Sequence, residues 1–496
     1  MIQLNATTLS SIDMARGVAP KTERVIQFGE GGFLRAFCDW MIDKANEAAG
    51  MDAGVVVVQP IERGMIGMLN AQDGLYTQIL RGQVDGKPMK DTRIIQCVKR
   101  GISPYEDFEG YLALAHNKDM RFIISNTTEA GIVYTGKDSF DDKPQASFPG
   151  KLTRLLYERF TAFGGAKGTG FILLPCELID YNGRNLKECC LKTADQWNLS
   201  AEFKTWLEEE NVFCSTLVDR IVTGYPRGEA EAIWQKIGYE DNIIVTAEPF
   251  GLWVIESAKD ISAELPLPAI GLPVIFTDNQ KPYKQRKVRI LNGAHTSFVP
   301  AAFQCRHDIV LQAMNDPMIL NFMQKTLYDE VIPTLTLDKA DLMAFAEAVT
   351  GRFKNPFIKH ALLAICLNSV SKWRARCMPS LLIYAEKEGR LPEHLTFSLA
   401  TLMGLYHGGK LTGDGKLECL RDGQPYYLQD DAAVLEFFAT TSDLPAREQV
   451  ERFLGNESFF GPDLIRVPGL VDSVTASYEA ILSRGAKAVF LEKFPV

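Results

Sequence analysis

The fold is decided by one stretch near the start of the chain, Arg24-Val25-Ile26-Gln27-Phe28-Gly29-Glu30-Gly31-Gly32-Phe33-Leu34. Residues 24–28 predict a short strand, a glycine turn follows, and residues 34–47 predict a helix. The backbone N–H groups of such a turn and the dipole of the helix both favour a pyrophosphate. Residues 54–58, Gly-Val-Val-Val-Val, predict the second strand of a βαβ unit. The sequence therefore predicts a dinucleotide-binding fold.

The turn is a variant of the usual glycine pattern, because Leu34 stands where a third glycine is expected. A glycine-rich loop that binds nothing is the alternative interpretation of the turn taken alone. After the second strand the chain continues Gln59-Pro60-Ile61-Glu62-Arg63, so the acidic residue that usually binds the ribose does not follow directly. Glu62 could reach a ribose hydroxyl, whereas Arg63 could attract a 2′-phosphate.

The rest of the chain predicts two domains. Up to about residue 264, short β-rich runs such as residues 122–125 and 170–174 alternate with helical stretches, as in a doubly wound sheet. The proline-rich residues 265–273 break this pattern, and helical periodicity prevails beyond them. We expect an α/β Rossmann-type, dinucleotide-binding domain at residues 1–280. A mainly α-helical, substrate-binding and catalytic domain should follow at residues 281–496, with an irregular surface excursion at residues 408–429.

Candidate catalytic groups lie in Lys287-Val288-Arg289-Ile290-Leu291-Asn292-Gly293-Ala294-His295. A lysine whose pKa is lowered by burial can exchange a hydroxyl proton, while an amide and an imidazole hydrogen-bond a carbonyl oxygen, so no metal is needed. A helix that simply ends at Gly293 is the alternative interpretation. On an ideal α-helix, Lys287 and Asn292 differ by about 140° and by about 7.5 Å of rise. We therefore expect Gly293 to end or bend the helix, or the lysine stem to swing across.

Composition limits the partners. The chain has 496 residues, 46% of them hydrophobic and 23% charged, and a net charge of -9. This charge argues against a general nucleic-acid surface and requires a locally basic pocket for any anionic substrate. Arg352, Lys359, His360, Lys372 and Arg376 crowd one region, although a solvated helix face is the alternative. The N-terminus lacks a signal-peptide pattern, and no stretch approaches the ~18 apolar residues of a membrane span. We expect a cytoplasmic protein without membrane or nucleic-acid partners.

Cysteine and histidine spacing does not predict a metal site. The ten cysteines are scattered without a CxxC pair, so reduced and mostly buried thiols are favoured over zinc ligands or disulfides. The six histidines show no HExxH or other close ligand cluster.

Several segments together resemble the polyol-specific long-chain dehydrogenases, the mannitol dehydrogenase family. The similar segments are residues 29–36, 72–77, 126–131, 218–221, 248–256, 287–295 and 352–356, in order along nearly the whole chain. The resemblance implies metal-independent hydride transfer with NAD, with Lys287 as general acid/base, Asn292 as oxyanion donor and His295 as ligand of a substrate hydroxyl. It also implies two sets of binding residues. The cofactor set is Phe28, Gly29, Glu30, Gly31, Gly32, Phe33, Leu34, Asn126, Thr127 and Thr128, and the substrate set is Arg352, Asp219 and His360.

Within that family, residues 29–35 and 175–183 are most similar to the branch that interconverts the sugar acids tagaturonate and altronate. The fructuronate and mannitol branches, which usually have histidine in place of Leu34, remain alternatives. So does a nucleotide sensor without catalysis, although a sensor has no need of Lys287. The sequence does not predict the oligomeric state.

One departure from the family concerns the oxyanion site. Leu178 replaces a second oxyanion asparagine of mannitol-type members. Asn182 could substitute for it, or belong to a plain turn. Glu177 and Asp180 could bind substrate hydroxyls or simply be solvated.

Overall fold

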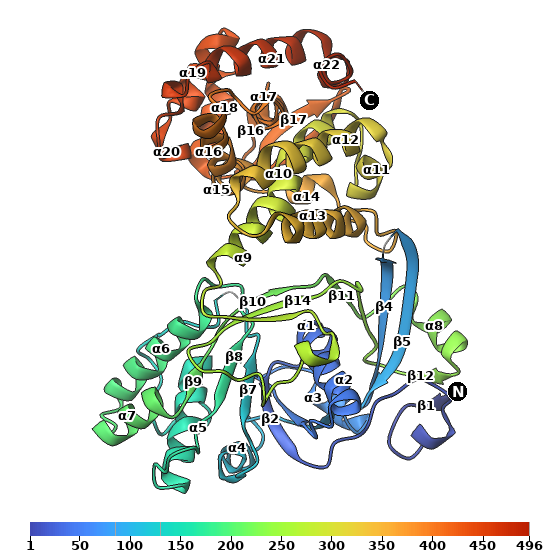
Figure 1. Cartoon of the computed structure of the whole chain (residues 1–496), viewed down its shortest axis with the longest axis vertical. Helices are drawn as coiled ribbons and strands as arrows, with labels where there is room; N and C mark the ends of the chain where they lie inside the picture. The colour runs from blue at the N-terminus through green and yellow to red at the C-terminus, as the bar shows by residue number, and fades with distance from the viewer. Residues whose placement is uncertain (85, 129, 496) are drawn as a thin grey trace. The chain divides into compact units, whose positions relative to one another are not determined.

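The computed structural model describes residues 1–84, 86–128 and 130–495 of the chain (Figure 1). They form two compact units, each described by itself below. Unit 1 consists of Met1–Gly82 and Pro88–Gln280, and unit 2 of Gln83–Lys87 and Lys281–Val496.

Unit 1 is built on a six-stranded, all-parallel sheet with the order β6-β3-β2-β7-β8-β9. Its strands are β2 (Glu23–Phe28), β3 (Gly54–Val58), β6 (Val98–Ile102), β7 (Phe122–Ser125), β8 (Ile172–Pro175) and β9 (Val212–Phe213). Numbered by their sequence within this sheet, the strands run 3-2-1-4-5-6, which is the Rossmann order. The predicted Rossmann-type fold is confirmed. The order reverses between β2 and β7, and ligands of such sheets bind at the carboxyl ends of the strands at that point.

Two separate cores cover the two faces of this sheet. Val55 and Val57 of β3 belong to one core and Val56 and Val58 to the other, because successive strand side chains point to opposite faces. A strand buried on both faces needs apolar residues at every position, which explains the unbroken valine run. One face is packed by α1 (Gly32–Leu34), α2 (Trp40–Ala48) and α3 (Ile66–Ala71). The other is packed by α4 (Phe108–Ala113), α5 (Phe148–Ala162), α6 (Asn182–Gln196) and α7 (Ala201–Glu209).

Smaller sheets and one more helix complete unit 1. The sheet β11-β13-β4-β5 contains β4 (Tyr76–Val84), β5 (Lys87–Ile95), β11 (Val222–Gly224) and β13 (Val245–Ala247). The sheet β10-β14-β15 contains β10 (Ser215–Asp219), β14 (Leu252–Glu256) and β15 (Val274–Thr277). A third small sheet pairs β1 (Ile2–Gln3) with β12 (Tyr239–Glu240). The additional helix of unit 1 is α8 (Ala230–Ile237).

Unit 2 is mainly helical, as predicted. Its helices are α9 (Lys281–Arg286), α10 (Gly293–Gln304), α11 (Val310–Asn315), α12 (Pro317–Lys325), α13 (Lys339–Phe353), α14 (Leu362–Ile365), α15 (Ser369–Arg376), α16 (Met378–Glu388), α17 (Glu393–Tyr406), α18 (Ala432–Thr441), α19 (Ala446–Leu454), α20 (Glu457–Phe460), α21 (Leu470–Arg484) and α22 (Ala486–Lys493). The central helix is α17, which packs against α10 and α21. Most of its residues are buried, as expected of a helix enclosed by others.

The prediction of an irregular excursion at residues 408–429 is wrong. This segment forms a three-stranded antiparallel sheet of β16 (Lys410–Leu411), β17 (Leu417–Arg421) and β18 (Gln424–Leu428). Asp422 and Gly423, both with positive φ, form the two-residue turn between Arg421 and Gln424. An Asp-Gly pair is a strong signal for such a hairpin, because both turn positions need positive φ.

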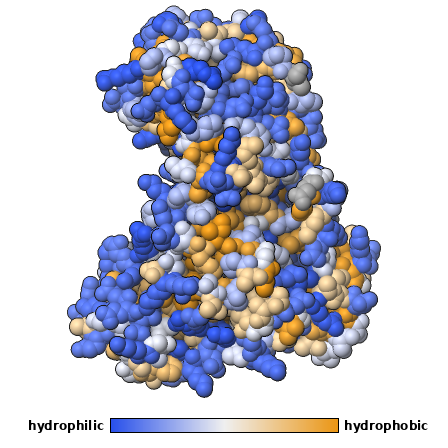
Figure 2. All heavy atoms as spheres, viewed as in Figure 1, coloured by the Kyte–Doolittle hydropathy of each residue, from blue (hydrophilic) through white to orange (hydrophobic). Residues whose placement is uncertain are grey.

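Surface and core agree with the composition. All ten cysteines are buried free thiols, as predicted. On the face shown in Figure 2, hydrophilic residues cover much of each unit and apolar residues are visible in smaller areas. Among the described residues, no helix combines the length and the apolar character that a bilayer crossing requires.

Candidate active site

The glycine turn follows β2 at the point where the strand order reverses. Gly29 has a φ of 124° and donates its N–H to the carbonyl of Val58, at 3.1 Å. A Cβ at Gly29 would lie 3.1 Å from the Asn126 carbonyl oxygen and 3.3 Å from Leu34 Cδ1, so both φ and crowding require glycine. A Cβ at Gly31, in contrast, would meet nothing within 4 Å. The backbone at Gly31 is thus accessible to a ligand at the start of the helix.

A buried polar network holds the turn from behind. Arg35 donates from Nε to the carbonyl of Glu30 at 3.0 Å and from Nη1 to that of Ile243 at 2.6 Å. Gln27 donates to the carbonyl of Gly29 at 3.1 Å and lies 3.4 Å from Asp39. Tyr76 also donates to Asp39, at 3.1 Å, and burial raises the pKa of this fully buried carboxyl group to about 7. These side chains fix the backbone of the turn.

The loop after β7 lies beside the turn. The Asn126 N–H donates to the carbonyl of Phe28 at 3.1 Å. Glu177 Oε1 accepts from the N–H and the hydroxyl of Thr127, each at 3.0 Å, while its Oε2 accepts from Ser125 at 3.1 Å. Thr128 has a φ of 86°, an unusual conformation for a β-branched residue. The predicted cofactor residues 28–32 and 126–128 are therefore brought together at the reversal point.

Glu177 is a residue whose role the sequence interpretation missed. It is only 2% exposed, so the alternative of a solvated loop carboxylate is wrong. The pKa of its carboxyl group is raised by burial, although hydrogen bonds from Ser125 and Thr127 oppose this shift. Glu177 positions the Thr127 backbone.

Asn182 provides no second oxyanion donor. Its buried amide donates to the carbonyls of Pro175, Glu177 and Thr216, and its Oδ1 accepts from the N–H groups of Gly183 and Thr216. The plain-turn alternative is also wrong, since Asn182 begins α6 and connects the ends of β8 and β10. Leu178 is 61% exposed.

A cavity of about 380 Å³ in unit 1 is lined by Pro60 and Ile61 after β3, Thr127 and Thr128 after β7, and Ser147 and Phe148 at the start of α5. Ala146, which precedes these two residues, and the cationic side chain of Lys137 also line the cavity. Glu62 and Arg63 follow directly and are both exposed. The cavity adjoins the loop that contains the predicted cofactor residues.

The segment of unit 2 that contains the candidate catalytic residues is π-helical from Lys287 to Asn292 and continues into α10. In a π-helix, residue i bonds to residue i+5, so Lys287 and Asn292 lie one turn apart rather than on opposing faces. Gly293 has φ −65° and ψ −40° and lies inside the helix. The expectation that Gly293 ends the helix is wrong, because Gly293 has a helical backbone and α10 continues to Gln304.

His295 lies one helical turn beyond Asn292 and is surrounded by cations. Its ring stacks on Phe353, with centroids 4.0 Å apart, and meets the His360 ring edge-on at 5.4 Å. Burial and then the charges of His360, Arg352, Arg376 and Lys372 hold the pKa of His295 well below its ordinary value. Its Nε2 is buried and has no hydrogen-bond partner within the described parts of the chain. His295 is thus a neutral imidazole with unused hydrogen-bonding capacity.

The predicted substrate residues belong to both units. Arg352, in the last turn of α13, is buried, and His360 is half-buried, both beside His295 in unit 2. Lys359 is exposed. Asp219 is buried at the end of β10 in unit 1.

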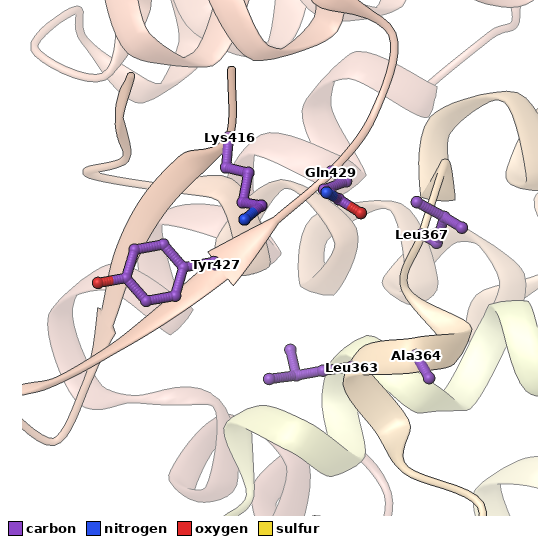
Figure 3. Close-up of a pocket in the computed structure, with 6 residues that line it drawn as sticks. All are labelled: Leu363, Ala364, Leu367, Lys416, Tyr427 and Gln429. Atoms are coloured by element: carbon purple, nitrogen blue, oxygen red, sulfur yellow. The ribbon is translucent and has the colours of Figure 1, made fainter. Parts of the chain in front are cut away.

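A second cavity, of about 460 Å³, lies in unit 2 between α14 and the small sheet (Figure 3). It is lined by Leu363, Ala364, Leu367, Lys416, Tyr427 and Gln429, none of which is a predicted site residue. Lys416 pairs with Asp414 at 2.7 Å.

Three other histidines pair with carboxylates: His116 with Glu158, His307 with Asp316 and His394 with Glu330. Across residues 1–84, 86–128 and 130–495, no group of three or more His, Cys, Asp or Glu side chains is arranged to hold a metal ion.

Two solved structures share the fold over nearly the full length of both chains. The Pseudomonas fluorescens mannitol 2-dehydrogenase, solved as a ternary complex with NAD and D-mannitol, has a TM-score of 0.68 at 22% identity and covers 99% of this chain and 100% of its own. A D-sorbitol dehydrogenase in substrate-free form has a TM-score of 0.80 at 20% identity, with the same coverage of 99% and 100%.

Curated relatives are much more similar in sequence. Altronate oxidoreductase of Enterobacter sp. (strain 638) is 48% identical over 488 residues, which are 97% of this chain and 98% of that protein. Altronate oxidoreductase of Klebsiella pneumoniae (strain 342) is 50% identical over 472 residues, which are 94% and 95% of the two chains.

Family models cover both units. The mannitol dehydrogenase Rossmann domain matches residues 23–269, and the mannitol dehydrogenase C-terminal domain matches residues 279–482. The chain belongs to the mannitol dehydrogenase family of oxidoreductases.

Proposed function

We propose that this oxidoreductase interconverts tagaturonate and altronate with NAD as the hydride carrier. The observation that supports a sugar-acid substrate best is the group of cations around His295, in a chain whose net charge is -9. A carboxylate needs such local positive charge when it leaves water. The relatives named altronate oxidoreductase, at 48% and 50% identity over nearly the whole chain, support the choice of acid.

The residues of unit 1 fit a dinucleotide. The positive φ of Gly29, the open backbone at Gly31 and the helix that starts at Gly32 suit a pyrophosphate. The cavity of about 380 Å³ beside Thr127 has room for the adenosine half. We favour NAD over NADP because Glu62 can bind a ribose hydroxyl, and because the fold relative from Pseudomonas was solved with NAD. When bound, the nicotinamide supplies or accepts the hydride.

The side chains of unit 2 supply the proton chemistry. In ketone reduction, the ammonium group of Lys287 donates a proton to the substrate oxygen as that oxygen becomes an alkoxide. The amide of Asn292, one π-turn away, donates a hydrogen bond to the same oxygen and stabilises the developing charge. Neutral His295 orients the substrate by a hydrogen bond between its Nε2 and a hydroxyl group next to the reacting carbon. In alcohol oxidation, neutral Lys287 accepts the proton.

The test is a substrate panel of tagaturonate, fructuronate and fructose, each assayed with NADH and with NADPH. We expect the highest kcat/KM for tagaturonate with NADH. A clear preference for fructuronate or fructose would assign the chain to another branch of the family. Stronger use of NADPH than of NADH would overturn the cofactor assignment.

A further inference from the structure

Two cations on α15 lie next to the helix of the candidate catalytic residues. Lys372 and Arg376 are four positions apart and therefore share one face of α15. Arg376 donates from Nη1 to the hydroxyl of Thr296, the residue after His295, at 3.3 Å. The two helices approach so closely that a Cβ at Gly293 would lie 3.3 Å from the Arg376 carbonyl oxygen. The glycine thus permits the contact that brings α15 to the site.

Within the described parts of the chain, neither Lys372 nor Arg376 forms an ion pair with a carboxylate; their hydrogen bonds go to a carbonyl and a hydroxyl oxygen. Three other partly buried arginines do have one: Arg154 pairs with Glu158, Arg121 with Glu264 and Arg421 with Asp308. Arg159 and Arg289 hydrogen-bond to carbonyl and hydroxyl oxygens instead. Lys372 likewise donates to the carbonyl of Ile365 at 3.0 Å.

The charged forms of Lys372 and Arg376 are less stable in this position than they are in water. Burial lowers the pKa of Lys372 and that of Arg376, and the charge of Arg376 lowers the pKa of Lys372 further. Among the described residues, the carboxylate of Asp430 raises the pKa of Lys372, but it accepts hydrogen bonds from Tyr406 at 2.6 Å and from the Val370 N–H at 3.2 Å. Half-buried charges without counter-ions are costly, and an anionic ligand would relieve this cost.

We propose that Lys372 and Arg376 together bind the carboxylate of the substrate and so determine the preference for a sugar acid over a neutral ketose. This inference rests on the proposed function and extends the carboxylate site beyond the predicted Arg352, which already makes other interactions. A guanidinium has five N–H donors, and the hydrogen bond from Arg376 to Thr296 uses only the Nη1 nitrogen. The planar fork can hold a carboxylate in two parallel hydrogen bonds, while Lys372 adds a point charge.

The test compares R376Q, K372Q and the double variant with wild type, using tagaturonate and fructose as substrates and saturating NADH. R374Q is the matched control, because Arg374 lies on the same helix but is exposed. We expect each single variant to raise KM for tagaturonate about 10- to 100-fold, the usual effect of a lost charged hydrogen bond. The kcat/KM for fructose should stay within about twofold, and R374Q should behave like wild type.

Two results would overturn the proposal: KM for tagaturonate within about twofold of wild type in the double variant, or equal losses on tagaturonate and fructose. The conservative variant R376K keeps the charge and decides the matter if R376Q does not fold, since it removes the fork and should raise KM for tagaturonate alone. Unchanged KM in R376K would then reject the role of Arg376. The two hypotheses fail differently: a wild-type preference for another substrate rejects the proposed function, whereas a tagaturonate preference that survives in the variants rejects only the carboxylate pair.

Discussion

Lys287 is the residue on which the proposed chemistry depends most directly, because it is the proposed proton donor on the π-helical turn that it shares with Asn292. We expect K287A to lower kcat by about 10²- to 10⁴-fold, the range for loss of a general acid or base. NADH affinity, measured by fluorescence titration, should not change. K325A, at an exposed lysine that ends α12, is the control. A kcat of K287A within a few-fold of wild type would remove Lys287 from this role.

Asp39 makes the stability of unit 1 depend on pH. Its folded-state pKa is about 7 against an ordinary value of 3.8, chiefly because of burial. A raised pKa means that the folded state holds the proton more tightly, so this contribution to stability is complete below pH ~4 and is lost as pH rises to ~7. The loss corresponds to about 4 kcal/mol in the free energy of unfolding.

The variant D39N, which mimics the protonated group, should remove this dependence. We expect it to match wild type in urea denaturation near pH 4 and to be the more stable protein at pH 8. The difference between the two proteins isolates Asp39 from other titrating groups. A difference that stays constant between pH 4 and pH 8 would contradict the assigned cause.

For individual residues, the location of a candidate site residue was easier to predict from the sequence than its hydrogen-bond partners. Residues 28–32 could be proposed because the glycines and the end of a strand are visible in the sequence, whereas residues 126–128 were proposed from the family resemblance alone. The roles of Glu177 and Asn182 could not be predicted, since they come from bonds to Thr127 and Thr216, which are distant in sequence. A polar residue after a strand gives no signal that it will be buried.

Two glycines test packing at the scale of the helix. Gly67 is the second residue of α3 and Gly183 is the second residue of α6. A Cβ at Gly67 would meet nothing within 4 Å, whereas one at Gly183 would overlap the carbonyl oxygen of Cys214. We expect G67A to stabilise unit 1 by about 0.5–1 kcal/mol and G183A to destabilise it by about 1–3 kcal/mol or more. Thermal unfolding of both variants measures this, and a Tm of G183A equal to that of G67A would refute the close packing of α6.

Secondary structure was predictable where one local pattern dominates. The valine run gave β3, and the helical periodicity gave unit 2 its class. The π-helical turn at Lys287–Asn292 was not predictable, because α- and π-helices accept the same residues and differ only in their hydrogen-bond register. The hairpin of β17 and β18 was missed for another reason: the Asp-Gly signal is present, but the helical context outweighed it.

At the scale of the whole molecule, the division into two units locates the effect of the cofactor. A ligand that binds only the native state at 100 times its Kd stabilises it by about 2.7 kcal/mol. We expect NADH to slow amide hydrogen exchange most strongly at residues 28–34 and 126–128, where the candidate cofactor residues lie in unit 1. Exchange with and without NADH, read by peptide mass spectrometry, is the measurement. Protection confined to unit 2 would contradict the assignment of the dinucleotide site.

The π-helical turn has an evolutionary consequence. A π-turn arises when one residue is inserted into an α-helix, so Lys287, Asn292 and His295 are kept in phase by a residue count and not by side-chain identity. Descendants of this chain can replace Val288 or Ile290 by other apolar residues gradually. They cannot lose or gain a residue between Lys287 and His295 without rotating one of the three candidate catalytic groups away from the others. Across divergent members, this segment should therefore vary in composition while its length stays fixed.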